Sequence, residues 1–168
     1  VGPVRARIEL SSSRLKPGET FTLTVKVNPN GHGVSGGELD LLMLDPQVFE
    51  ILADTVSPGD LLGADPLEGR NEMAESEEGV SLYYAIARRG ESPYLSEEKT
   101  LASVDIRVRG GASPGHYAIP NAIVLTDESF SLLEFDPPIV SVEVLSRLPG
   151  DLDGDDSVGL SDLAILAS

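Results

Sequence analysis

The residues best suited to chemistry lie near the end of the sequence, where five of the thirteen aspartates fall within twelve positions. Aspartates occupy positions 1, 3, 5 and 12 of a loop that starts at Asp151, and these are Asp151, Asp153, Asp155 and Asp162. Calcium takes about six to eight oxygen ligands, and alternate residues of a loop wound around the ion point inward. The spacing therefore predicts a Ca²⁺ site, with the backbone carbonyl of Ser157 at position 7 as a further ligand.

Two loop positions depart from the usual pattern. Position 6 is normally glycine but is Asp156 here, and aspartate tolerates the left-handed backbone region better than most residues do. Position 12 is Asp162 rather than glutamate, so its shorter side chain must bring the following helix closer to the ion. Leu163 and Leu166, three residues apart, predict that helix over residues 160–167. The alternative is a chance match in an aspartate-rich chain.

Most of the chain before this loop alternates apolar and polar residues with a period of two, as a half-buried strand does. Turn-forming Gly and Pro clusters separate the alternating segments, which favours an antiparallel sandwich over βαβ units. We expect about nine strands between Val4 and Leu145, and no amphipathic helix before residue 150. The residues predicted to be buried between two sheets are Phe21, Leu23, Val25, Ile106, Val108, Val142 and Val144.

The composition changes abruptly after a short linker. We therefore divide the chain into a β-sandwich over residues 1–146, a linker over 147–150 and the calcium loop with its helix over 151–168.

The 168 residues include no cysteine, which excludes a disulfide framework. The formal net charge of −16 argues against binding to nucleic acid. The sequence contains no run of eighteen apolar residues, so we do not expect a membrane-spanning segment.

The tail resembles one known module. Gly150-Asp-Leu-Asp-Gly-Asp155, followed by Ser157-Val158 and Ser161-Asp162-Leu163, resembles the first half of a dockerin, the calcium-dependent module that binds cohesins. Dockerins contain two such loop-helix repeats, and this sequence contains one.

The preceding domain resembles a cohesin. The similar segments are an Asp-Pro turn after a strand, a Pro-Gly-Asp loop and a late strand with its turn: residues 36–46, 48–51, 57–62, 101–108 and 110–115. The resemblance implies a nine-stranded antiparallel jelly-roll β-sandwich with no catalytic activity. It also implies an extracellular or cell-surface scaffold that takes part in carbohydrate metabolism, with a dockerin-bearing protein as partner. Self-association through the C-terminal half-dockerin is a further possibility.

One segment suggests where a partner binds. Apolar side chains occupy both faces of the strand expected at residues 39–44, so one face would be an exposed apolar stripe. We predict that this stripe carries Leu39, Leu41 and Met43, extended by Tyr83 and Ala85. The alternative is a strand covered on both faces by loops. On the partner side, the dockerin resemblance assigns the equivalent contacts to Leu160, Ser161 and Leu163 of the tail.

Three other functions remain to be weighed. A carbohydrate-binding module needs a planar strip of exposed aromatic rings, which Tyr83, Tyr84, Tyr94 and Tyr117 would form only if strand register gathers them. A structural surface-layer or adhesion module would share the fold and the calcium. An enzyme is not expected, because His32 and His116 both lie at turns and no nucleophile motif accompanies them.

Overall fold

The computed structural model describes residues 2–91 and 93–146. The predicted calcium ligands and the predicted tail contacts lie outside the described residues, so these assignments stay predictions. They are Asp151, Asp153, Asp155, Ser157 and Asp162 for calcium, and Leu160, Ser161 and Leu163 for the partner.

The described residues form strands and no helix, as the period-two alternation predicted. No helix among them could therefore cross a membrane. The strands are β1 (Arg5–Leu10), β2 (Arg14–Leu15), β3 (Thr20–Asn28), β4 (Gly36–Leu44), β5 (Phe49–Pro58), β6 (Leu67–Glu75), β7 (Val80–Ala87), β8 (Lys99–Val108), β9 (Gly115–Ala118), β10 (Asn121–Thr126) and β11 (Ser141–Val144).

The expected count of nine strands is not confirmed, because the described part of the chain contains eleven. Two interruptions account for the difference. The serines at 11–13 separate β1 from β2, and Ile119 with Pro120 separates β9 from β10. Proline has no backbone N–H to donate to a neighbouring strand, so a break at Pro120 is expected.

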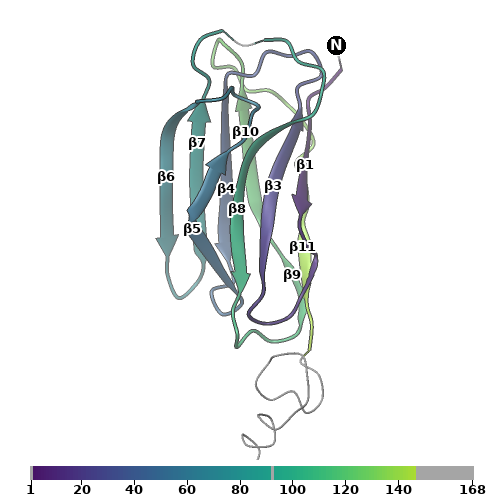
Figure 1. The fold of residues 1–168 in the computed structure, drawn as a ribbon, viewed down its shortest axis with the longest axis vertical. Coiled ribbons are helices and arrows are strands. Elements are labelled where there is room, and N and C mark those ends of the chain that lie inside the picture. Colours follow the sequence, from purple (N-terminus) through teal and green to yellow (C-terminus); the bar gives the residue numbers. More distant parts are fainter. Residues whose placement is uncertain (1, 92, 147–168) are drawn as a thin grey trace, which may run out of the picture.

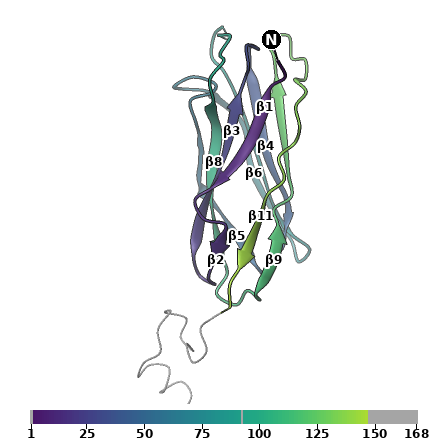
Figure 2. The same ribbon diagram turned by 90° about the vertical axis from the view of Figure 1, so that its right-hand side faces the viewer.

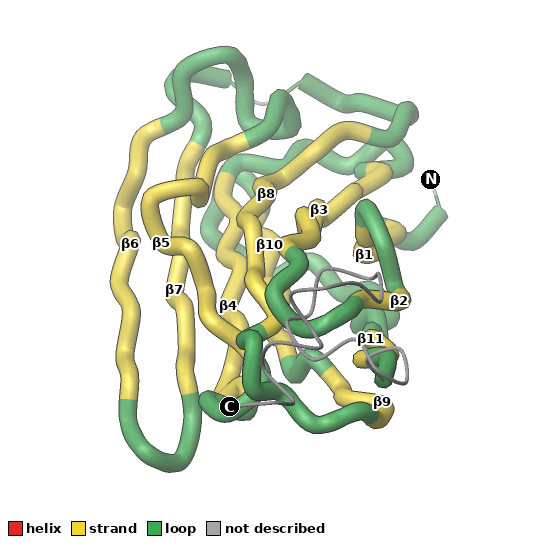
Figure 3. The backbone as a smooth tube through the Cα atoms, turned by 60° about the horizontal axis from the view of Figure 1, so that its bottom comes forward, coloured by secondary structure: helices red, strands yellow, loops and turns green. Residues whose placement is uncertain are grey.

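The strands pack as a sandwich whose long axis follows the strand direction (Figures 1 and 2). The first sheet has the order β1-β3-β8-β5, and the second sheet has the order β10-β4-β7-β6. Both are antiparallel throughout. A short third sheet, β2-β11-β9, contains the one parallel pair of the described strands, β2 with β11. Figure 3 shows β6 at the free edge of the second sheet.

The core fills the space between the sheets with apolar side chains from alternate positions. All seven residues predicted to be buried are at most 2 % exposed. Three aromatic rings pack at one end: Phe21 contacts Phe49 edge-on at 6.4 Å between ring centroids, and Phe49 contacts Tyr117 at 5.9 Å. Burial of this apolar surface is the main stabilising contribution to the fold. The sandwich therefore holds the second sheet as a rigid platform.

Candidate functional site

The strand β4 presents its leucines to the core rather than to a partner. Leu39 and Leu41 are 1 % and 0 % exposed, so neither belongs to an exposed stripe, and the prediction that placed them there is wrong. The pairing of β4 with β7 gives the physical reason. Leu39 lies opposite Tyr84, and Asp40 lies opposite Tyr83. Residues directly opposite in an antiparallel pair share a face, so Tyr83 lies beside Asp40 on the outer face.

Met43 is exposed because β4 contains a bulge. The register between β4 and β7 shifts between Leu41 and Leu44, which turns Met43 away from the core. Met43 has a φ of 54° and its side chain is 51 % exposed. Its amide donates a hydrogen bond to the Ser81 hydroxyl at 2.9 Å. A non-glycine residue in the left-handed region costs about 1 kcal/mol or more, so the surrounding structure must hold it there.

Gly79 makes room for this bulge. A Cβ at position 79 would lie 2.7 Å from the Cα of Met43, which is closer than real Cβ atoms approach backbone. The bulge and its glycine therefore fix an exposed, adaptable thioether at one end of the outer face of the second sheet.

Two rows of side chains cross this outer face from β10 to β6. The first row runs Ala122, Asp40, Tyr83, Glu72, and the second runs Val124, Glu38, Ala85, Arg70. The residues on β10, β4 and β7 are half-buried by their neighbours, and those on the edge strand β6 are exposed. Tyr83 and Ala85 therefore lie on the outer face, as predicted, although beside carboxylates instead of leucines. Small and apolar side chains alternate here with acidic ones.

The two carboxyl groups of β4 interact strongly. Burial first, and then the nearby charge of Glu38, raise the pKa of Asp40 to about 6. The Oδ1 atom of Asp40 is buried and accepts no hydrogen bond from the described part of the chain. A buried acceptor without a donor is costly, so this oxygen is suited to receive a proton or a donor from outside.

Arg70 supplies positive charge at the β6 side of the face. Its guanidinium lies over the ring of Tyr83, 4.4 Å from the centroid, and its Nε contacts Glu72 at 3.2 Å. The same charge acts on Asp40 by lowering its pKa, though less than burial and Glu38 raise it. Arg70 is therefore directed toward Tyr83 and Glu72 and leaves the Glu38–Asp40 pair incompletely neutralised.

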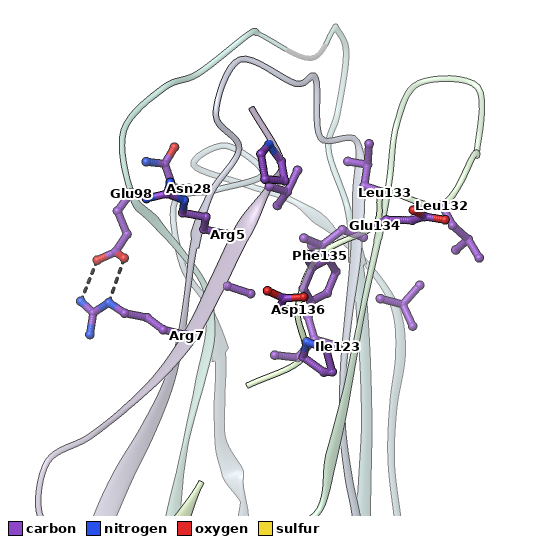
Figure 4. A pocket seen from close by; sticks show the side chains of 16 residues that line it. Arg5, Arg7, Asn28, Glu98, Ile123, Leu132, Leu133, Glu134, Phe135 and Asp136 are labelled. Atoms are coloured by element: carbon purple, nitrogen blue, oxygen red, sulfur yellow. Dashed lines mark hydrogen bonds and ion pairs between the residues drawn. The ribbon is translucent and has the colours of Figure 1, made fainter. Parts of the chain in front are cut away.

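A groove of about 1,230 Å³ lies between β1, β10 and the segment that follows β10, and Val124 is common to the groove and the outer face. Figure 4 shows Arg5 and Arg7 on one wall and Phe135 with Asp136 on the other. Arg7 is already engaged, because its Nε and Nη2 contact the Glu98 carboxylate at 2.8 and 2.7 Å. The groove brings together none of the residues that the sequence singled out.

The tyrosines do not form the strip that a sugar-binding face requires. Tyr83 points outward and Tyr84 is 2 % exposed in the core. Tyr117 packs on Phe49. Tyr94 is 77 % exposed and lines a separate hollow with His32, while His116 lies on β9 beside Glu143. Neither a carbohydrate platform nor a catalytic pair of histidines is assembled by the described residues.

Sequence reasoning missed Glu38, Asp40 and Arg70 as candidate contacts. The signal was present in Gly37-Glu-Leu-Asp-Leu41, because the acids alternate with leucines and so mark the outer face of a half-buried strand. The run of leucines that continues through Leu42 and Leu44 masks this alternation.

No protein-family model matches the sequence, and no curated protein matches it. Several solved structures are similar in fold. The non-cellulosomal cohesin of the archaeon Archaeoglobus fulgidus aligns with a TM-score of 0.60 and 18 % identity, over 86 % of this chain and 93 % of that chain.

Two further similar structures were solved as complexes. The third ScaC cohesin of Acetivibrio cellulolyticus, in complex with the ScaB dockerin, gives a TM-score of 0.65 and 12 % identity over 85 % of this chain and 99 % of that chain. Coh-OlpC of Clostridium thermocellum, in complex with Doc435, gives a TM-score of 0.58 and 16 % identity. The alignment covers 85 % of this chain and 95 % of that chain. The described domain therefore has the cohesin fold, a jelly-roll sandwich.

Proposed function

We propose that this domain is a non-catalytic interaction module that binds a calcium-loaded dockerin on the outer face of the second sheet. The observation that carries the proposal is the combination of the cohesin fold with this face. Several similar structures were solved with dockerins bound. Here the same fold presents a face of small, apolar and acidic side chains, with the exposed Met43 at one end.

The energetics of the face suit a helix-bearing partner. Ala122, Val124 and Ala85 have short side chains, so a helix can approach the sheet closely and bury apolar area. Tyr83 adds an aromatic ring that Arg70 already holds in place. A preorganised aromatic at the centre of an interface is a common source of binding energy.

A bulky side chain at position 85 tests the proposal. Ala85→Trp introduces a residue with good strand propensity and places a large ring in the middle of the face, so we expect dockerin binding to weaken about 30-fold or more. Binding would be measured by titration calorimetry against purified, calcium-loaded dockerins encoded by the source organism. Ser103→Trp is the matched control, because Ser103 lies on β8 of the first sheet.

The outcomes separate clearly. Unchanged affinity in Ala85→Trp, with an intact fold by circular dichroism, would place the partner elsewhere. Equal losses in both variants would contradict a specific face. If no dockerin binds the parent protein, the structural surface-layer reading replaces this one.

We also propose that the tail binds one Ca²⁺ through Asp151, Asp153, Asp155, Ser157 and Asp162, as a dockerin-like half-repeat. The support is the oxygen-ligand spacing of the sequence. The double variant Asp151→Ala/Asp162→Ala should lose calcium binding in a titration of the full chain. Retained affinity would show that the loop assignment is wrong. Self-association through this tail, and a secreted or cell-surface location, belong to the same proposal.

A further inference from the structure

The carboxyl groups of Glu38 and Asp40 lie two residues apart on the outer face of the second sheet, near its centre. Each neighbouring strand can be examined for the charge that would balance them. On β10, Asp40 faces Ala122 and Glu38 faces Val124, neither of which is charged. On β7, they face Tyr83 and Ala85. The two carboxyl groups therefore have no cation on either flanking strand.

The edge strand β6 carries the nearest charges. Arg70 and Glu72 lie one strand further away, opposite Ala85 and Tyr83. Arg70 contacts Glu72 and stacks on Tyr83, so two other groups already engage it. Burial and the charge of Glu38 act on Asp40 more strongly than Arg70 does, and the net result is a pKa of about 6. At about pH 6 and below, the free face therefore holds a proton that an isolated aspartate would have lost.

Resting on the proposed function, we infer that the bound partner places a basic side chain over Glu38 and Asp40, and that docking expels the proton from those free molecules in which Asp40 is protonated. The buried Oδ1 of Asp40, which has no donor in the described part of the chain, then accepts a hydrogen bond from that cation. The Asp40 carboxyl group goes to carboxylate, and the proton passes to solvent. The balance requires no other reactant.

This arrangement selects among partners of one fold. A lysine or arginine on the docking helix satisfies an acceptor to which no residue in 2–91 or 93–146 donates, while an acidic residue at the same place would meet two carboxylates. The direction with pH follows from the proton release. Affinity rises with pH through the range in which Asp40 ionises, because less work is then needed to remove the proton.

The experiment measures protons directly. The tightest-binding of the calcium-loaded dockerins encoded by the source organism is titrated into the full chain at pH 6. The titration is repeated in calcium-containing buffers that differ in ionisation enthalpy. The dependence of heat on buffer gives the number of protons released. We expect about half a proton per complex for the parent protein and almost none for Asp40→Asn. The parent affinity should rise about 10-fold between pH 5 and pH 7.5, and that of Asp40→Asn should stay nearly flat.

Two controls keep the result specific. Asp54→Asn makes the same change of charge at an exposed position of β5, in the first sheet, and should keep the full proton release. Replacing each basic helix residue of the dockerin by glutamine in turn should identify one variant that loses the pH dependence.

Four results would overturn the inference. Tight binding without proton release, or release that persists in Asp40→Asn, removes the proton from this pair and leaves the proposed function standing. Proton release on adding CaCl₂ alone, before any dockerin, to the parent protein but not to Asp40→Asn would make the pair a metal site. Absence of dockerin binding to every variant and to the parent would defeat the proposed function itself.

Discussion

The outer faces of the two sheets differ in how completely their polar groups are satisfied. On the first sheet, the Thr22 hydroxyl donates to Asp105 at 2.6 Å, and the Lys26 ammonium donates to the Thr100 hydroxyl at 2.8 Å. Arg7 lies against Glu98. In cross-strand polar pairs of this kind, each side chain satisfies the hydrogen-bonding groups of the other. Such a face is stable in water without a partner.

The second sheet is different on the same criterion. Its outer face combines two acidic side chains that repel each other, a buried oxygen to which no described residue donates, and the exposed Met43 on a strained backbone. Each of these features costs stability in the isolated domain. Natural sequences keep such costs where function requires them. The contrast therefore points to the second sheet as the face that is completed by binding.

The largest effect on stability is expected when a charged residue is placed on the core-facing side of β4. Leu41→Asp puts a carboxylate at a position that is 0 % exposed, and we expect it to destabilise the domain by about 4 kcal/mol or more. Urea unfolding followed by circular dichroism would measure this loss. A normally folded Leu41→Asp would mean that Leu41 is not in the core and that the face assignment is inverted.

A smaller effect is expected where the bulge meets its neighbour. Gly79→Ala drives a methyl group into the backbone of Met43, so it should lower the unfolding free energy by about 1 to 3 kcal/mol. Gly69→Ala on β6 is the control, because its new methyl would meet nothing closer than 3.7 Å. Equal stability of the two variants would show that the bulge does not depend on Gly79.

The smallest expected effect has the opposite sign. The folded state raises the pKa of Asp40 from 3.8 to about 6, so the folded protein binds this proton more tightly than the unfolded chain does. Its contribution to stability is then lost as the pH rises from about 4 to 6. Asp40→Asn should stabilise the domain by about 1 kcal/mol at pH 7.5, a value reduced for solvent screening at this partly exposed site.

The pH series makes the Asp40→Asn prediction specific. The gain in stability should shrink toward zero as the pH falls below about 4, where the parent aspartate is protonated in both states. Thermal unfolding at several pH values would measure it. A gain that is independent of pH would show that packing, and not ionisation, is responsible. Increased stability together with weaker partner binding would sharpen the contrast between the two sheets.

The core was predictable from the sequence because its strands alternate strictly. In β3, Phe21, Leu23 and Val25 have only polar residues between them, so only one face could be buried. In β4, leucines occupy both odd and even positions around Leu42, so the sequence does not show which face is buried. The bulge at Met43 then changes which positions face the core. A pattern of period two cannot register an inserted residue, so the face could be assigned only once the pairing with β7 was known.

The electrostatic part of the site could not be predicted for a related reason. Arg70 is distant from Glu38 and Asp40 in the sequence and reaches their face only through the order of strands β4, β7 and β6. The Oδ1 atom of Asp40 likewise lacks a hydrogen-bond donor among the described residues because of which side chains lie beside it on β10 and β7. Residue types gave the candidates, and strand order gave their environment.

Mapping the contact surface by amide hydrogen exchange tests the central claim most directly. The full chain would be compared free and saturated with its tightest-binding, calcium-loaded dockerin. We predict that protection increases in peptides from β4, β6, β7 and β10, while β1, β3, β5 and β8 of the first sheet stay unchanged. New protection confined to the first sheet, or to the groove between β1 and the segment after β10, would contradict the account.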